Sequence, residues 1–135
     1  MALASGVPLE NRAVTIDPVP RVLDASERRV LDRPLSVDFV GVEALRVQSS
    51  MVLGQRACRC GCASLDLVVA QSAPLAHVTE RVPVSAAARL PEPIGAVEIL
   101  LFLDGGQLSL MEIASDGDQV PARWPDPGTL VIDAR

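Results

Sequence analysis

Hydrophobic residues follow two different spacings along the chain, and the spacing changes near residue 50. Upstream of that point, apolar positions recur at the helical period, as on a helix with one buried face. Downstream, they mostly alternate with polar positions, as on a strand with one buried face. The sequence therefore predicts two short N-terminal helices followed by a sheet.

The first helix is predicted in the segment DASERRVLDRP. The Asp24 side chain can accept a hydrogen bond from the backbone of Glu27, and the Glu27 side chain can accept one from the backbone of Asp24, which is a capping box. Pro34 disfavours the helical conformation at the residue before it. We therefore expect this helix to end near Asp32.

A second helix is predicted over residues 38–48, where Val40, Ala44 and Val47 share one stripe. Before both helices, residues 1–20 contain three prolines and no periodic pattern, which indicates an extended arm. The remaining residues, 21–135, have the length of a single domain.

Strands are predicted in the segments MVLGQRA, ASLDLVV and HVTERVPV, and in a short closing segment, TLVID. The strongest local pattern is a hairpin in AVEILLFLDGGQLSLMEI, with its turn at Gly105-Gly106, because glycine tolerates the positive φ angles of tight turns. This register pairs Leu103 with Leu108 and Leu101 with Leu110. Apolar residues on both faces of the hairpin predict a central position in the sheet, with helices covering one side.

Helices followed by sequential strands, without alternation of the two, favour an α+β fold. We expect a four- to five-stranded, mainly antiparallel meander sheet. The chain is 49% hydrophobic, yet Phe39, Phe102 and Trp124 are its only aromatic residues. The core is therefore predicted to consist of aliphatic side chains, which pack well on a pleated sheet.

All twelve basic residues are arginine, and they are unevenly distributed. Residues 1–60 hold eight Arg against seven acidic residues, whereas residues 61–135 hold four against ten, a net charge of −6. No cluster of basic residues offers a phosphate-binding surface, so nucleic acid is not expected as a partner. The chain shows no signal-peptide pattern, no apolar run of membrane-spanning length and an odd number of cysteines, which together predict a cytoplasmic protein without membrane contact.

The segment CRCGC holds all three cysteines at alternate positions. On a straight strand, Cys58 and Cys62 would lie roughly 13 Å apart, which is too far for shared coordination of one zinc ion. We therefore expect buried structural cysteines, with no disulfide between Cys58 and Cys60 or between Cys60 and Cys62. The alternative is a bulge at Gly61 that folds Cys62 back, giving a thiol- or zinc-binding site with His77 as a possible fourth ligand.

Acid–base catalysis has few candidate residues in this sequence. His77 is the single histidine, and neither lysine nor tyrosine occurs. In the predicted hairpin register, Glu98 and Glu112 face opposite sides of the sheet, so they form no obvious acid–base pair. A small-ligand enzyme with His77 or a carboxylate as its base is therefore a further alternative, and no cofactor is predicted.

A partner surface is predicted in the acidic second half of the chain. Glu112, Asp116 and Asp118 follow one another closely, and Trp124 in the same region could act as an aromatic anchor. Acidic residues gathered on one surface speed the encounter with a basic protein. Our principal hypothesis is a small, non-catalytic interaction module for a basic protein partner, and the sequence leaves the oligomeric state open.

Three segments, CRCGCASLDL, LLFLDGGQLSLMEIASDGD and WPDP, resemble a family of short uncharacterised proteins from high-GC bacteria. The likeness extends over residues 24–130. It implies a self-contained domain that includes the cysteine segment and the loop around Trp124. Because no activity is assigned to that family, the resemblance transfers no site residue and no cofactor.

Overall fold

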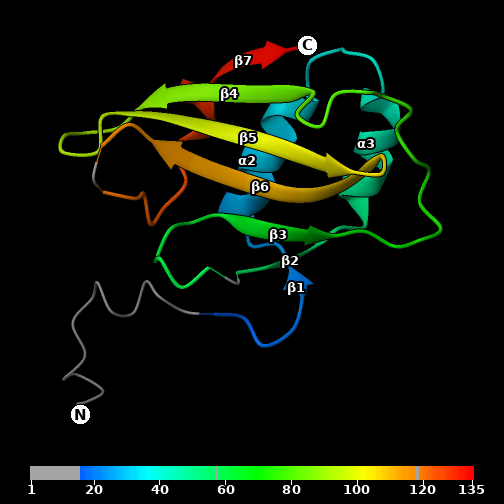
Figure 1. Ribbon diagram of the computed structural model, residues 1–135, viewed down its shortest axis with the longest axis horizontal. Helices are drawn as coiled ribbons and strands as arrows, with labels where there is room; N and C mark the ends of the chain where they lie inside the picture. The colour runs from blue at the N-terminus through cyan, green and yellow to red at the C-terminus, as the bar shows by residue number, and fades with distance from the viewer. Residues whose placement is uncertain (1–15, 57, 118) are drawn as a thin grey trace.

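Two helices pack behind an antiparallel sheet (Figure 1). The computed structural model describes residues 16–56, 58–117 and 119–135. Within these residues the sheet has seven strands in the order β1-β2-β3-β6-β5-β4-β7. The strands are β1 (Arg21–Val22), β2 (Leu53–Gln55), β3 (Leu65–Val68), β4 (Val84–Arg89), β5 (Ala96–Asp104), β6 (Gln107–Ser115) and β7 (Val131–Ala134). The helices are α2 (Ala25–Leu35), α3 (Val42–Ser50) and the short 3-10 helix η1 (Pro127–Thr129).

The α+β class and the antiparallel sheet are confirmed, but the predicted strand number and the simple meander are wrong. The sheet contains two runs of consecutive antiparallel strands, β1-β2-β3 and β4-β5-β6. These runs join where β3 pairs with β6, and β7 pairs with the outer side of β4. The helices do not precede the whole sheet either, since β1 comes before α2 and pairs with β2. A strand of two residues is too short to show an alternating pattern, which is why the sequence did not reveal it.

Helix α2 begins with the predicted capping box. The Glu27 N–H donates to Asp24 Oδ1 at 2.8 Å, and the Asp24 N–H donates to Glu27 Oε1 at 2.9 Å. The helix continues through Pro34 to Leu35, three residues beyond the predicted end. Pro34 and Leu35 are both buried, and their burial offsets the hydrogen bond that proline cannot make.

Helix α3 begins at Val42, four residues later than predicted, because Gly41 has a φ of +90° and precedes the helix as its N-cap. The later start changes the buried face. Val42, Leu45 and Gln48 are buried, whereas Val40 and Val47 of the predicted stripe are exposed. The strand predicted over residues 77–84 is also wrong, since β4 begins at Val84 and the preceding residues belong to the long connection from β3.

The hairpin of β5 and β6 turns at Gly105-Gly106, and Leu103 pairs with Leu108, as predicted. Beyond this pair the register shifts by one residue between Phe102 and Leu103. Leu101 therefore lies opposite Met111 and not Leu110, which brings Met111 into the core with no exposed surface. A β-bulge of this kind lets the larger apolar side chains of both strands face inward.

The bulge also places Glu98 and Glu112 on the same face of the sheet, so the prediction that they face opposite sides is wrong. Glu112 lies opposite Leu100, and Glu98 lies opposite Ala114, so both glutamates are on the face of the sheet that the helices leave open. The same face carries Phe102, with the Arg81 guanidinium 5.4 Å from the centre of its ring.

The covered face holds the aliphatic core that the composition predicted. Within the described part of the chain, no helix is long and apolar enough to cross a membrane.

The hairpin turn provides a first test of the fold. Gly106 has a φ of +82°, and a Cβ atom there would lie 2.5 Å from the backbone oxygen of Ala76. Gly106→Ala is therefore expected to lower the free energy of unfolding by about 3 kcal/mol, from the positive φ angle and the steric clash together. Urea denaturation measures this change.

Gly105→Ala is the matched control. Gly105 also has a positive φ, +58°, but a Cβ there meets no atom within 4 Å. Only the cost of the backbone conformation applies, about 1 kcal/mol. Equal losses for the two variants would contradict the described contact between the turn and Ala76.

Candidate functional site

The three cysteines lie on the loop between β2 and β3, and the residues around them do not form a strand. Gly61 adopts a φ of +85°, a left-handed conformation that interrupts the extended course of a strand. Cys58 and Cys60 are exposed, whereas Cys62 is buried with 7% of its surface accessible. The prediction of three small residues on a buried strand is therefore wrong, and the turn at Gly61 is the alternative that the structure contains.

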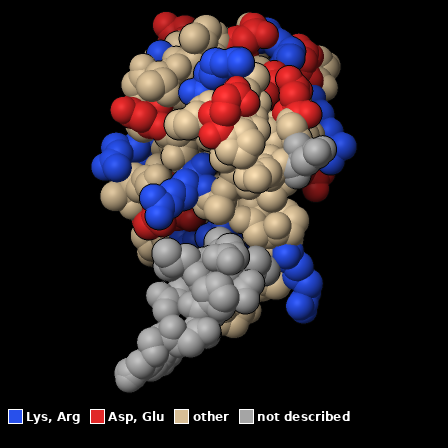
Figure 2. Space-filling view, turned by 90° about the vertical axis from the view of Figure 1, so that its left-hand side faces the viewer, with Lys and Arg blue, Asp and Glu red and all other residues tan. Residues whose placement is uncertain are grey.

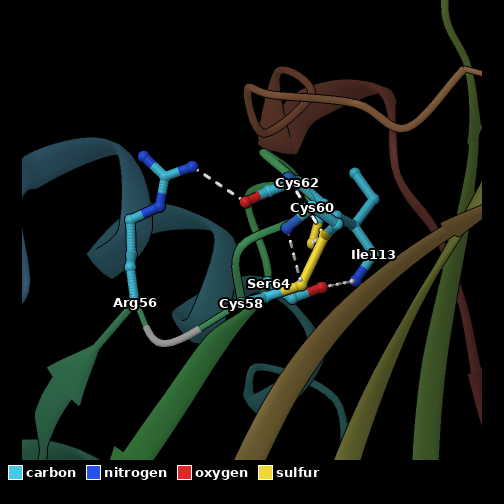
Figure 3. Close-up of a disulfide and its surroundings, with 6 residues drawn as sticks. All are labelled: Arg56, Cys58, Cys60, Cys62, Ser64 and Ile113. Carbon is cyan, nitrogen blue, oxygen red and sulfur yellow. Dashed lines mark hydrogen bonds between the residues drawn. A yellow bond between two sulfur atoms is a disulfide. The ribbon is translucent and has the colours of Figure 1, made fainter. Parts of the chain in front are cut away.

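The turn brings all three sulfur atoms together (Figure 3). They lie within 4.8 Å of one another. Cys58 and Cys60 are joined by a disulfide, contrary to our prediction, and the Sγ atoms of Cys60 and Cys62 are 2.9 Å apart. The straight-strand geometry on which that prediction rested does not apply to a loop with a left-handed glycine.

Backbone N–H groups of the loop point at the sulfur atoms. The Cys60 N–H donates to Cys58 Sγ at 3.3 Å, and the Cys62 N–H donates to Cys60 Sγ at 3.4 Å. Such bonds stabilise negative charge on sulfur when the disulfide is reduced. The loop backbone thus provides donors for thiolates as well as the turn that gathers them.

Contacts from several elements hold the loop in place. The Arg56 guanidinium donates to the carbonyl oxygen of Cys62 at 2.8 Å (Figure 3). The Ala63 N–H donates to the carbonyl oxygen of Pro121 at 2.9 Å. The Ser64 hydroxyl oxygen accepts a bond from the Ile113 N–H of β6 at 3.0 Å. The loop is therefore attached to the sheet on the side that leads into β3.

Arg56 is itself held by a partly buried network of charged residues. The backbone N–H of Arg56 donates to Asp17 Oδ2 at 2.8 Å, and the backbone N–H of Asp17 donates to the Arg56 carbonyl oxygen at 2.9 Å. Asp17 also accepts a hydrogen bond from Arg21, which makes a bidentate pair with Glu27. The hydrogen bonds to Glu27 raise the pKa of the Arg21 side chain above the ordinary arginine value, and partial burial of Arg21 opposes this rise. Sequence patterns did not reveal this network, because Arg56 is 39 residues away from Asp17 along the chain.

A groove of about 480 Å³ lies beside the sulfur atoms. The cysteine loop forms one wall, and residues after β6 form another. Its floor is the open face of the sheet, which contributes Asp66, Leu110 and Glu112. A small molecule can therefore approach the sulfur atoms from this side. Ser64 and Asp66 are groove residues that the sequence analysis missed.

His77 lies far from the cysteines. It is exposed on the connection between β3 and β4, and it lines hollows beside the hairpin turn and the start of α3. The cysteine groove lies beside Ala114 and Ser115, at the opposite end of β6. The nine residues of β6 span roughly 27 Å. Among the described residues that could ligate a metal, the group that gathers here consists of the three cysteines, so His77 is not their fourth ligand.

The predicted partner surface is spread over several places. Glu112 is half-buried on the floor of the groove, and Asp116 is exposed just after β6. Asp118 lies outside the described residues. Trp124 packs against the core and lines a separate hollow beside the start of α2. The structure therefore does not bring Trp124 to Glu112.

Charge on the side of the molecule drawn in Figure 2 is mixed, with acidic and arginine side chains interleaved. This distribution gives the acidic residues no continuous surface on that side. Binding of a basic protein stays a prediction, as does catalysis by His77 or a carboxylate.

Comparison of the chain with protein-family models, with curated proteins and with solved structures finds no match. The resemblance to short proteins of high-GC bacteria stays a prediction. The chemistry of the site therefore has to be inferred from its own geometry.

Proposed function

We propose that the protein binds a thiophilic metal ion through the thiolates of Cys58, Cys60 and Cys62. The observation that carries the proposal is the convergence of three sulfur atoms within 4.8 Å on one short loop. Sulfur ligands at about 2.3 Å from a zinc ion lie about 3.8 Å from one another in tetrahedral geometry. Once the Cys58–Cys60 disulfide is reduced, small shifts of the sulfur atoms are enough to reach that spacing.

The donor set favours soft or borderline metal ions. Thiolates prefer Zn²⁺ or Cu⁺ to Mg²⁺ or Ca²⁺, which take oxygen ligands. Three protein ligands leave a fourth position of a tetrahedral ion for water or a ligand from solution. That position would face the groove, because all three cysteines line it.

Zinc binding by the reduced protein tests this function. The wild type, reduced and kept under nitrogen, is expected to bind one equivalent of Zn²⁺ in competition with a chromophoric chelator. Loss of a residue that hydrogen-bonds to a metal ligand typically lowers the metal affinity about 10–100-fold. Replacing a ligand itself should therefore lower the zinc affinity by more than about 100-fold. We expect this loss for each of Cys58→Ser, Cys60→Ser and Cys62→Ser.

His77→Ala is the control, since His77 lies at the other end of β6, and its zinc affinity should equal that of the wild type. Two results would contradict the proposal. One is a reduced wild type that binds no zinc. The other is a serine variant at one of the three cysteines that keeps the full affinity.

A further inference from the structure

The three cysteines differ in solvent accessibility, and the accessible ones are those that form the disulfide. Cys58 and Cys60 are exposed, whereas Cys62 is buried with 7% of its surface accessible. The disulfide joins the two exposed residues and leaves Cys62 as the free thiol. The same sulfur atoms therefore take part in two alternative arrangements, a disulfide with one thiol or a set of three thiols.

The Cys58–Cys60 disulfide and a metal site of three thiolates cannot exist at the same time. The thiolate is the form of cysteine that ligates a metal, and a disulfide has given up the charge of both its sulfur atoms. With Cys58 and Cys60 joined, Cys62 is the one thiolate left, which is too few for a stable zinc site. Metal binding and the Cys58–Cys60 disulfide thus compete for the same two residues.

We propose that a small-molecule disulfide oxidises Cys58 and Cys60 through the groove and thereby releases the metal, so that the thiol redox state controls metal loading. This inference rests on the proposed function. The groove of about 480 Å³ gives such an oxidant access to the two exposed sulfur atoms. Cys62 is protected by its burial, and its carbonyl oxygen is held by Arg56.

The reaction proceeds by two thiol–disulfide exchanges. One exposed thiolate attacks the small disulfide, forms a mixed disulfide and releases one small thiolate. The other exposed thiolate then attacks the cysteine sulfur of the mixed disulfide and releases the second small thiolate. Cys58 and Cys60 together lose two electrons, the small disulfide gains them, and the metal ion loses two of its three protein ligands. Excess small thiol reverses both steps.

The experiment starts from the zinc-loaded, reduced wild type. Oxidised glutathione is added, and a zinc indicator follows release of the metal. We expect loss of the bound equivalent of zinc together with the loss of two titratable thiols. Reduced glutathione in excess, with added zinc, should restore both.

Trypsin digestion identifies the disulfide that forms. Cleavage after Arg56 and Arg59 places Cys58 in one peptide, and Cys60 and Cys62 in the next, which ends at Arg81. The expected bond links the two peptides, and alkylation before digestion labels Cys62. Cys62→Ser is the matched variant, and it should form the same linked peptides although it no longer holds zinc tightly.

The outcomes separate the two proposals. Zinc that stays bound in oxidised glutathione, or a disulfide within the peptide that contains both Cys60 and Cys62, overturns the redox inference and leaves the metal site standing. A reduced protein that binds no zinc at the start overturns the metal site and the redox inference with it.

Discussion

Replacement of Gln48 by leucine is expected to lower the free energy of unfolding by about 3 kcal/mol, although leucine has a similar size. Gln48 is fully buried on α3. Its Nε2 group donates to the carbonyl oxygens of Pro74 at 2.7 Å and Gly106 at 2.9 Å, and its Oε1 atom accepts from the Leu108 N–H at 2.9 Å. One side chain thus ties the hairpin turn and the β3–β4 connection to the helix.

In Gln48→Leu, the Leu108 N–H loses its bond in the protein interior, whereas the Pro74 carbonyl loses its bond in a residue that is itself exposed. Each buried polar group left without a partner costs about 1–3 kcal/mol. The Gly106 carbonyl keeps its bond from the Ala76 N–H, so it adds less. Urea denaturation measures the total effect.

Val47→Gln is the matched control on the neighbouring position of the same helix. Val47 is 44% exposed, so its substitution should change stability by less than about 0.5 kcal/mol. A loss of that size for Gln48→Leu as well would show that the described hydrogen bonds add little to stability.

Glu27→Ala is expected to lower the free energy of unfolding by about 3 kcal/mol, near the lower end for breaking a buried ion pair. The Glu27 side chain is 5% exposed and accepts bonds from Arg21 and from the Asp24 N–H. Its removal breaks the capping box and leaves the Arg21 guanidinium with Asp17 as its remaining carboxylate partner. Because Arg21 is about one-third exposed, water limits the loss.

Glu27→Ala should also weaken the contacts that hold the cysteine loop in place. Arg21 orients Asp17, Asp17 binds Arg56, and Arg56 holds the Cys62 carbonyl. Zinc affinity of the folded variant is therefore expected to fall, by less than about 10-fold, the smallest loss typical of a residue that hydrogen-bonds directly to a metal ligand.

Asp32→Ala is the control for Glu27→Ala on the same helix. Asp32 pairs with Arg28 at 3.7 Å, and its side chain is 59% exposed. Exposed pairs of this kind contribute less than about 1 kcal/mol, so the variant should unfold almost like the wild type. A zinc affinity that falls equally in both variants would contradict the described path from Glu27 to Cys62.

Local rules of sequence predicted the parts of the fold that depend on neighbouring residues. The capping box of Asp24 and Glu27 and the glycine turn at Gly105-Gly106 follow from side-chain hydrogen bonding and backbone freedom over a few residues. Both were correct, because no distant contact competes with them.

Pairings between distant segments could not be predicted in this way. The contact of β3 with β6 and the shift of register after Phe102 depend on which side chains fill the common core. Met111 lies opposite Leu101 and is fully buried, whereas pairing counted from the turn alone placed Leu110 opposite Leu101. Tertiary packing thus decided the register.

The cysteine site shows the same limit. The spacing of Cys58, Cys60 and Cys62 suggests a single face on a strand, but the positive φ of Gly61 and the bond from Arg56 to Cys62 produce a compact loop. Gly61 was the one local signal of this loop, and the support from Arg56 required the folded chain.

The most direct test of the proposed function is X-ray absorption at the zinc edge of the reduced, zinc-loaded protein. Three cysteine ligands predict three sulfur atoms at about 2.3 Å from the zinc and one lighter atom at about 2.0–2.2 Å. In Cys62→Ser, the number of sulfur ligands should fall. A wild-type zinc ion surrounded by nitrogen and oxygen alone would contradict the three-thiolate site.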